Sequence, residues 1–113
     1  MPSGDSGGGG GNGGPVNGGE ECKTHYGGAT LVSPKANVLR RLNVGDRLDV
    51  VVIEQNDRPI LCADKGGTLA GAVSHKSALQ IIKCINKGYR YVAVITKLEG
   101  ADCTLDIRME TGP

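Results

Sequence analysis

The residues best suited to chemistry are cations that lie close to aromatic rings. Tyr89 and Tyr91 flank Arg90 in the segment YRY, and three lysines precede it. Cations can pair with phosphates and a tyrosine ring can stack on a base, which is what binding of single-stranded nucleic acid requires. The candidate contact residues are Lys76, Lys83, Lys87, Tyr89, Arg90 and Tyr91. Acidic residues are interleaved in the following segment, so a solvated surface of mixed charge is the alternative interpretation.

Four cysteines occur without any C-x-x-C pair, so the spacing does not predict a structural zinc site. We expect three of them to act as small buried hydrophobic side chains: Cys62, Cys84 and Cys103. Cys22 and His25 form a C-x-x-H pair, which supplies only half of a zinc site. Because the N-terminus lacks the pattern of a secretory signal, we expect reduced thiols and a cytoplasmic protein.

The other polar residues do not predict catalysis. The segment Lys65-Gly66-Gly67-Thr68 lacks the insert and the following helix of a phosphate-binding loop, so a hairpin turn is expected there. The aspartates fall mainly in turns or at outward strand positions, and no carboxylate pair is placed for acid–base work. We therefore expect no enzyme, no metal and no cofactor.

Glycine divides the chain of 113 residues into two parts. Residues 1–28 hold 12 of the 19 glycines and little that can be buried, so we expect a disordered arm that acts as a tether or a passive spacer. Residues 29–113 have ordinary globular composition and predict one small domain. A net charge of +1 excludes a strongly basic nucleic-acid protein. No apolar run is long enough to cross a bilayer.

Short β-branched runs dominate the expected domain. The run 47–55 predicts a strand buried on much of both faces, and 103–110 alternates apolar with polar residues, as a strand with one wet face does. The glycines at 66 and 67 predict a hairpin between two strands. The expected strands are 29–32, 47–55, 60–64, 68–73, 89–98 and 103–110, with a short helical stretch at 36–42.

One amphipathic helix is expected between Ser74 and Gly88. The hydroxyl of Ser74 can cap the first turn, and Gly88 can adopt the left-handed conformation after the last turn. The apolar stripe comprises Ala78, Leu79, Ile81, Ile82 and Ile85, with Cys84 at its edge. The pattern favours a mainly β (α+β) domain, a small curled sheet or barrel of five to six strands whose open end this helix plugs. Because Trp and Phe are absent, its core must be aliphatic.

The segment from Val44 to Ile95 resembles a distant HIRAN domain, a small barrel attached to certain DNA-repair translocases and also found alone in bacteria. The resemblance rests on a Gly-Asp pair before a valine-rich strand, on the strand LAGAV that leads into the helix, and on the glycine that closes that helix. It implies binding to the ends of single-stranded DNA. The chain departs from the family at residues 56–59, Asn-Asp-Arg-Pro, where the aromatic residue of the family is missing.

Two functions follow as expectations. The first is a non-enzymatic recognition module that contacts single-stranded nucleic acid weakly through the cations and tyrosines named above. The second is a protein-interaction or assembly domain, tethered by residues 1–28, that uses an exposed strand edge or the helix face. Neither expectation involves a membrane.

Overall fold

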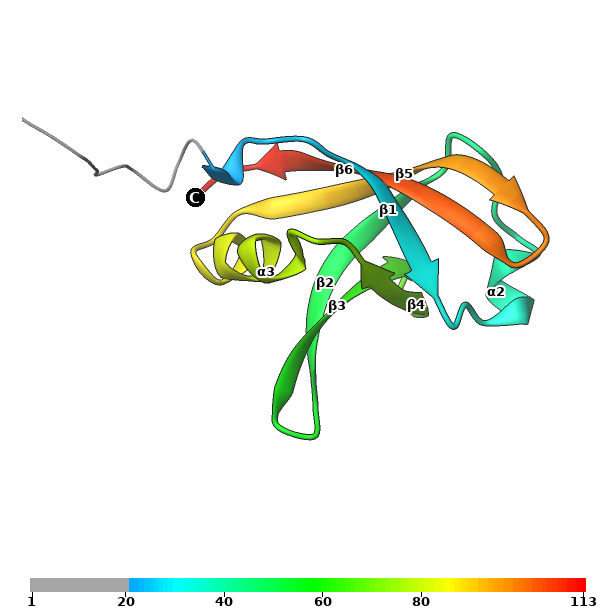
Figure 1. The fold of residues 1–113 in the computed structure, drawn as a ribbon, viewed down its shortest axis with the longest axis horizontal. Coiled ribbons are helices and arrows are strands. Elements are labelled where there is room, and N and C mark those ends of the chain that lie inside the picture. The colour runs from blue at the N-terminus through cyan, green and yellow to red at the C-terminus, as the bar shows by residue number, and fades with distance from the viewer. Residues whose placement is uncertain (1–20) are drawn as a thin grey trace, which may run out of the picture.

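The computed structural model describes residues 21–113, so the predicted disordered arm lies outside the described residues as far as residue 20. Strands predominate among the elements, and two helices interrupt them (Figure 1). In chain order the elements are β1 (Tyr26–Val32), α2 (Ala36–Leu39), β2 (Arg47–Gln55), β3 (Arg58–Lys65), β4 (Thr68–Ser74), α3 (Ala78–Asn86), β5 (Arg90–Glu99) and β6 (Asp102–Thr111).

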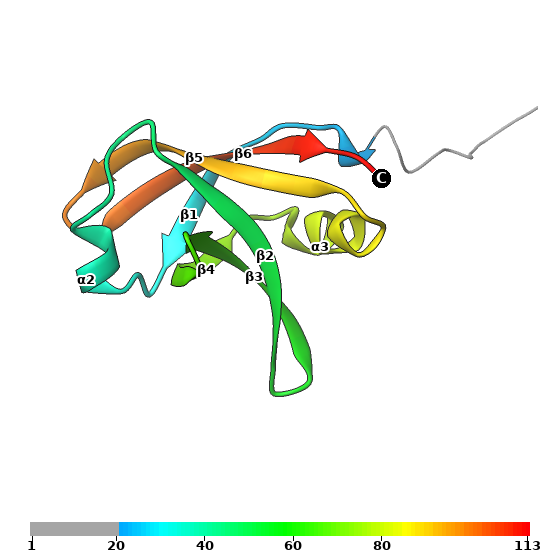
Figure 2. The same cartoon turned by 180° about the vertical axis from the view of Figure 1, so that it is seen from behind.

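The six strands form one closed antiparallel barrel in the order β1-β4-β3-β2-β5-β6, and β1 closes it by pairing with both β4 and β6. The helix α3 packs against β2, β3 and β5 beside one end of the barrel (Figures 1 and 2). The expected mainly β fold, a small barrel with an amphipathic helix, is therefore confirmed.

Aliphatic side chains fill the interior, as the absence of Phe and Trp requires. The largest fully buried aliphatic side chains come from β2, β3, β5, β6 and α3, and each is at most 2% exposed: Leu48, Leu61, Ile81, Ile95, Leu105 and Ile107. Tight packing of branched side chains provides most of the shape of this core, and the rings of Tyr26 and Tyr91 are buried with them.

Two tight turns connect the central strands. Asn56 and Asp57 both have positive φ, 53° and 62°, which is the geometry of a two-residue hairpin turn between β2 and β3. Gly66 and Gly67 form the next hairpin, where the Gly67 N–H donates to an Asp64 carboxylate oxygen at 2.8 Å. The hairpin predicted at the glycine pair is confirmed. The predicted turn at 56–59 is shorter, because its last two residues already belong to β3.

The helix α3 begins later than the sequence suggests. Ser74 does not cap it, because Ser74 still belongs to β4 and pairs with Thr30 of β1. Gly88 has φ +104° and ends the helical region as predicted. Leu79 was expected on the buried stripe and is 70% exposed, because the buried face of α3 is formed by Ile81, Ile82 and Cys84. No helix within residues 21–113 has the length and hydropathy to cross a membrane.

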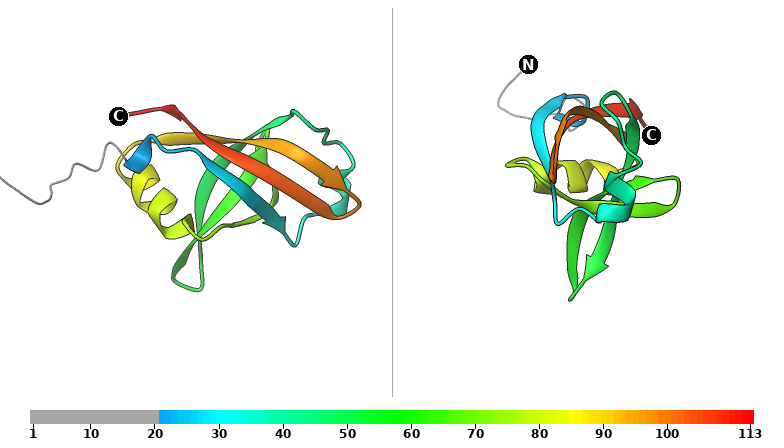
Figure 3. Two further views of the ribbon diagram at one scale, coloured as in Figure 1. Left: turned by 45° about the horizontal axis from the view of Figure 1, so that its top comes forward. Right: turned by 90° about the vertical axis from the view of Figure 1, so that its right-hand side faces the viewer.

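The folded part begins before the predicted boundary at residue 28. Tyr26 pairs with Ile107 of β6 and is 8% exposed, and Cys22 is fully buried. Figure 3 shows this N-terminal segment lying against the barrel close to the start of β5. Residues 21–28 therefore belong to the barrel, because their two apolar side chains have a place in its core.

Truncation of a central core side chain tests the barrel packing. Leu105 is fully buried, so Leu105→Ala should lower the free energy of unfolding by about 2–5 kcal/mol. Val44→Ala is the matched control, since Val44 is 61% exposed and should change the stability by less than about 0.5 kcal/mol. Urea unfolding followed by circular dichroism measures both. Equal losses would contradict the assignment of Leu105 to the core.

Candidate functional site

A disulfide fastens the N-terminal segment to α3. Cys22 and Cys84 are 62 residues apart in the sequence, their Cα atoms lie 5.5 Å apart, and neither side chain is exposed. The expectation that all thiols stay reduced is therefore wrong. The sulfur of Cys22 is bonded to that of Cys84, so the C-x-x-H pair has no free thiolate to offer a metal. Two distant cysteines meet only when β1 and α3 come together, and the spacing alone carries no sign of that.

Two tyrosines complete this attachment, which we call the clasp (residues 21–27 with Cys84, His75 and Tyr91). The Tyr91 hydroxyl donates to the Cys22 carbonyl oxygen, and the Tyr26 hydroxyl donates to the Glu21 carbonyl oxygen at 2.9 Å. Burial, reinforced by Tyr26 and Tyr89, raises the pKa of Tyr91 to about 12. Tyr91 is 2% exposed, so it cannot stack on a base as the sequence suggested.

His75 also belongs to the clasp. Its Nδ1 accepts the Ser77 N–H at 2.9 Å, so the neutral ring carries its proton on Nε2, which lies 3.1 Å from the Gly27 carbonyl oxygen and donates to it. The ring meets the edge of Tyr26 at a centroid distance of 5.7 Å. Both ring nitrogens of His75 are thus bonded to backbone groups in a structural role.

Cys62 and Cys103 remain as buried thiols. Burial raises the pKa of each, which disfavours the reactive thiolate. The predicted role of these two cysteines as small hydrophobic side chains agrees with their burial. Across residues 21–113, no three His, Cys, Asp or Glu side chains gather closely enough to hold a metal ion.

A groove of about 420 Å³ lies between β2 and the connection from α3 to β5, and we call it the strand-edge groove. Its floor is aliphatic, and Tyr89 and Arg90 supply its ring and its charge. Tyr89 is half-buried and packs against the core, while Arg90 is exposed. The lining residues are Val50, Val51, Val52, Ile85, Gly88, Tyr89 and Arg90.

One side of the strand-edge groove is an unpaired strand edge. β2 pairs with β5 only over Arg47–Val50, whereas it pairs with β3 from Asp49 to Gln55. No strand within the described part of the chain pairs with 51–55 on the side away from β3. Backbone N–H and C=O groups on such an edge can accept a further strand.

The structure brings together only part of the predicted contact residues. Tyr89 and Arg90 line the strand-edge groove, and exposed Lys87 directly precedes its Gly88. Lys83 is exposed one helical turn earlier on α3. Lys76 is exposed before the start of α3, at the opposite end of that helix from the groove residues 88–90.

The two segments of the chain that flank the groove differ in net charge. Residues 65–98, which include α3 and most of β5, contain six Lys or Arg and no carboxylate. Residues 46–64, the hairpin of β2 and β3, contain five carboxylates and two arginines, a net charge of −3. We call these two flanking segments the basic wall and the acidic wall. Among the residues that line the groove only Arg90 is charged, and Glu54 and Asp57 lie farther out on the hairpin.

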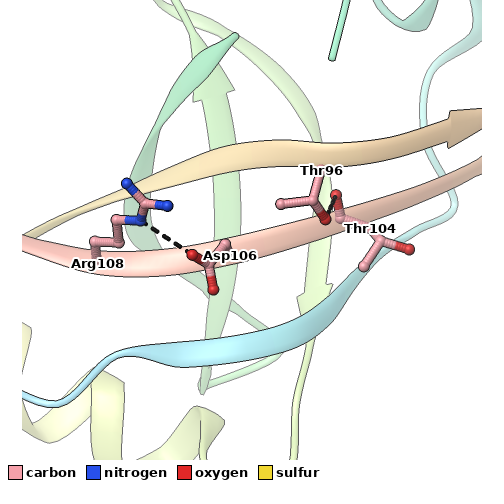
Figure 4. A network of polar contacts seen from close by, with 4 residues as sticks. All are labelled: Thr96, Thr104, Asp106 and Arg108. Atoms are coloured by element: carbon pink, nitrogen blue, oxygen red, sulfur yellow. Dashed lines mark hydrogen bonds and ion pairs between the residues drawn. The ribbon is translucent and has the colours of Figure 1, made fainter. Parts of the chain in front are cut away.

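The single cation of β6, Arg108, forms an ion pair with a neighbouring carboxylate. On the outer face of β6, Arg108 Nε lies 3.0 Å from an Asp106 carboxylate oxygen (Figure 4). Nearby, the Thr96 hydroxyl donates to the Thr104 carbonyl oxygen at 3.3 Å. Arg108 therefore adds little to any anion-binding surface.

A second groove, of about 460 Å³, lies at the other end of the barrel between α2 and the turn that joins β5 to β6. Its lining is apolar apart from one charged side chain, Arg40. The lining residues are Ala36, Leu39, Arg40, Leu42, Leu98, Gly100 and Ala101. The strand-edge groove is the better candidate site, because it combines unpaired backbone groups of β2, a ring and a positive charge.

Comparison with known proteins adds no family. No protein-family model, no curated protein and no solved structure matches this chain. The resemblance to HIRAN domains stays a prediction from the sequence.

The disulfide predicts a specific thiol count and a loss of stability on reduction. The unfolded, non-reduced protein should titrate two thiols, those of Cys62 and Cys103, and the reduced protein should titrate four. Because the bond closes a loop of 62 residues, its loss by Cys22→Ala with Cys84→Ala should cost about 4 kcal/mol of stability. Cys103→Ala is the control, since it should leave the effect of reductant on stability unchanged. Four thiols before reduction would contradict the bond.

Tyr91 predicts a defined alkaline dependence. Its pKa of about 12 in the folded protein lies above the ordinary value of 10, so ionisation favours the unfolded chain. The contribution of neutral Tyr91 is complete below pH 10 and is lost as the pH rises from about 10 to about 12.

Tyr91→Phe should lower the stability at neutral pH by about 0.5–1.5 kcal/mol, because the bond to the Cys22 carbonyl is lost. Its stability should also fall less steeply above pH 10 than that of the parent. Short urea unfolding measurements across this range test both effects, with Tyr89→Phe as control. The same alkaline slope in both variants would show that Tyr91 is not the group responsible.

Proposed function

We propose that this protein is a non-enzymatic recognition domain that binds an extended polypeptide strand along the free edge of β2. The observation that carries the proposal is the end of the β2–β5 ladder at Val50, five residues before β2 itself ends. An added strand would gain main-chain hydrogen bonds along residues 51–55, and its alternate side chains would contact the aliphatic floor of the groove.

The charges of the groove support a polypeptide over a polyanion. A nucleic acid strand in the groove would meet the basic wall near Arg90 but also the acidic wall that carries Glu54 and Asp57. A peptide strand can present charges of both signs, or none, to the two walls. The aliphatic lining also suits valine or isoleucine side chains better than phosphates.

Single-stranded nucleic acid is the second candidate, and one feature favours it. The exposed cations Lys83, Lys87 and Arg90 lie within six residues of the half-buried Tyr89 in the sequence, on a part of the chain that has no carboxylate. A strand lying over α3 rather than in the groove would avoid the acidic hairpin. Tyr91 takes no part in this version, since its ring is buried.

The disulfide supports an oxidising compartment. Buried disulfides persist mainly outside the reducing cytosol, so the Cys22–Cys84 bond weighs against the cytoplasmic location expected from the sequence. A location of this kind also favours a polypeptide ligand over intracellular nucleic acid.

A backbone substitution separates the two ligands. In a two-residue hairpin the residues flanking the turn bond to each other, so Gln55, Ile53 and Val51 direct their backbone groups to β3. The N–H of Glu54 then points to the free edge, where proline removes the donor without breaking the hairpin. Glu54→Ala is the matched control, because it removes the carboxylate and keeps the N–H.

The probe is an eight-residue peptide in which valine alternates with lysine and glutamate in turn, so that it carries both signs. It is titrated into the full chain and followed by amide NMR shifts. Binding should move the signals of residues 51–55 and should be about tenfold weaker in Glu54→Pro than in Glu54→Ala. An oligothymidylate followed by fluorescence anisotropy at two salt concentrations tests the second candidate. One result would overturn the first proposal in favour of nucleic acid. The oligothymidylate would bind in a salt-sensitive way, would lose that binding in Tyr89→Ala and in Arg90→Ala, and would bind Glu54→Pro like the parent.

A further inference from the structure

The outer half of the β2–β3 hairpin extends away from the barrel (Figures 1 and 3). β3 pairs with β4 only from Cys62 onward, and β2 pairs with β5 only up to Val50. Within residues 21–113, the segments 51–55 and 58–61 therefore have only each other as strand partners. Such an isolated two-stranded ribbon is only marginally stable in water.

The β2 part of this hairpin has the composition of a strand that is paired on both sides. Its sequence from residue 51 is VVIEQ, and Val51, Val52 and Ile53 are only half-buried by the barrel. Exposed strand edges in monomeric proteins are usually blocked by lysine, proline or a bulge. β2 shows none of these between Val51 and Gln55, and its register with β3 is regular throughout.

Charge is distributed along the edge in a self-complementary way. Glu54 and Asp57 lie at the outer end of the hairpin, whereas Lys87 and Arg90 lie at its base, beside the strand-edge groove. None of these four side chains forms an ion pair within the part of the chain that the structure describes. Antiparallel pairing of two identical edges brings the acidic end of each copy to the basic end of the other, whereas parallel pairing would place acid beside acid.

We propose that the strand added to β2 is β2 of a second copy of this chain, paired antiparallel about a two-fold axis near Ile53. The inference rests on the proposed function, since it requires that the β2 edge accepts a strand, and it names the partner. A two-fold contact uses the same surface on both copies, so each contact between an acidic end and a basic end forms twice. Because five residues a side make a small interface, the dimer is weak and its population depends on concentration.

Sedimentation velocity on the full, non-reduced chain from about 1 µM to 1 mM tests the inference, and the parent should pass from monomer to dimer. Glu54→Lys and Arg90→Glu should each weaken the association about tenfold, because each places like charges together twice across the two-fold axis. The double variant Glu54→Lys with Arg90→Glu should recover most of that loss. Arg41→Glu is the matched control, since it makes the same change of charge on an exposed side chain near α2 and should associate like the parent.

A second measurement guards against variants that fold poorly. Amide hydrogen exchange of the parent at high concentration should slow at Val52 and Glu54 relative to low concentration, whereas amides of the α2 region should not change. A chain that stays monomeric throughout, or a dimer insensitive to both charge reversals, would overturn the inference. Persistent binding of the valine–lysine–glutamate peptide to such a monomer would leave the proposed function standing, so the two failures are distinguishable.

Discussion

The early end of the pairing between β2 and β5 is the constraint on which the rest of the structure depends. β5 begins at Arg90 because α3 must first cover the end of the barrel, and Gly88 then turns the chain back at a positive φ of +104°. β2 is nine residues long and continues past this point. The barrel is therefore closed at its base and leaves a strand edge free, and the same turn places Tyr89 and Arg90 beside that edge.

The clasp explains why the turn can hold this position. Cys84 lies in the last turn of α3, and its carbonyl oxygen accepts the N–H groups of Lys87 and Tyr89. The sulfur of Cys84 is bonded to Cys22, whose carbonyl in turn accepts the Tyr91 hydroxyl. The helix end, the start of β5 and the N-terminal segment are thus connected by one covalent bond and a short set of hydrogen bonds. Cys22 and Tyr91, which the sequence analysis considered as a metal ligand and a base-stacking ring, thus hold the rim of the groove in place.

Opposite net charges on the two flanking segments are the electrostatic basis of the ligand that we propose for the groove. In a chain with a net charge of +1, no overall electrostatic preference is expected. The signs are nevertheless separated along the chain, because α3 and β5 up to Leu98 contain no carboxylate and the β2–β3 hairpin is acidic. A ligand that carries both signs, such as a polypeptide strand, meets both walls favourably, whereas a polyanion is favoured by only one of them.

The local pattern of the sequence determined the elements of this protein, and the tertiary structure decided what the candidate residues do. The β-branched run 47–55, the glycine pair at 66–67 and Gly88 act over a few residues, so the main strands, a hairpin and the helix end followed from propensity and turn chemistry. The roles of Cys22 and Tyr91 depend on contacts between residues more than 60 positions apart, and no local periodicity encodes them. Leu79 and Ser74 were misplaced for the same reason: pairing of β4 with β1 sets where the helix begins and which of its faces is buried. The free edge of β2 is likewise set by where another strand ends, and only the folded chain shows it.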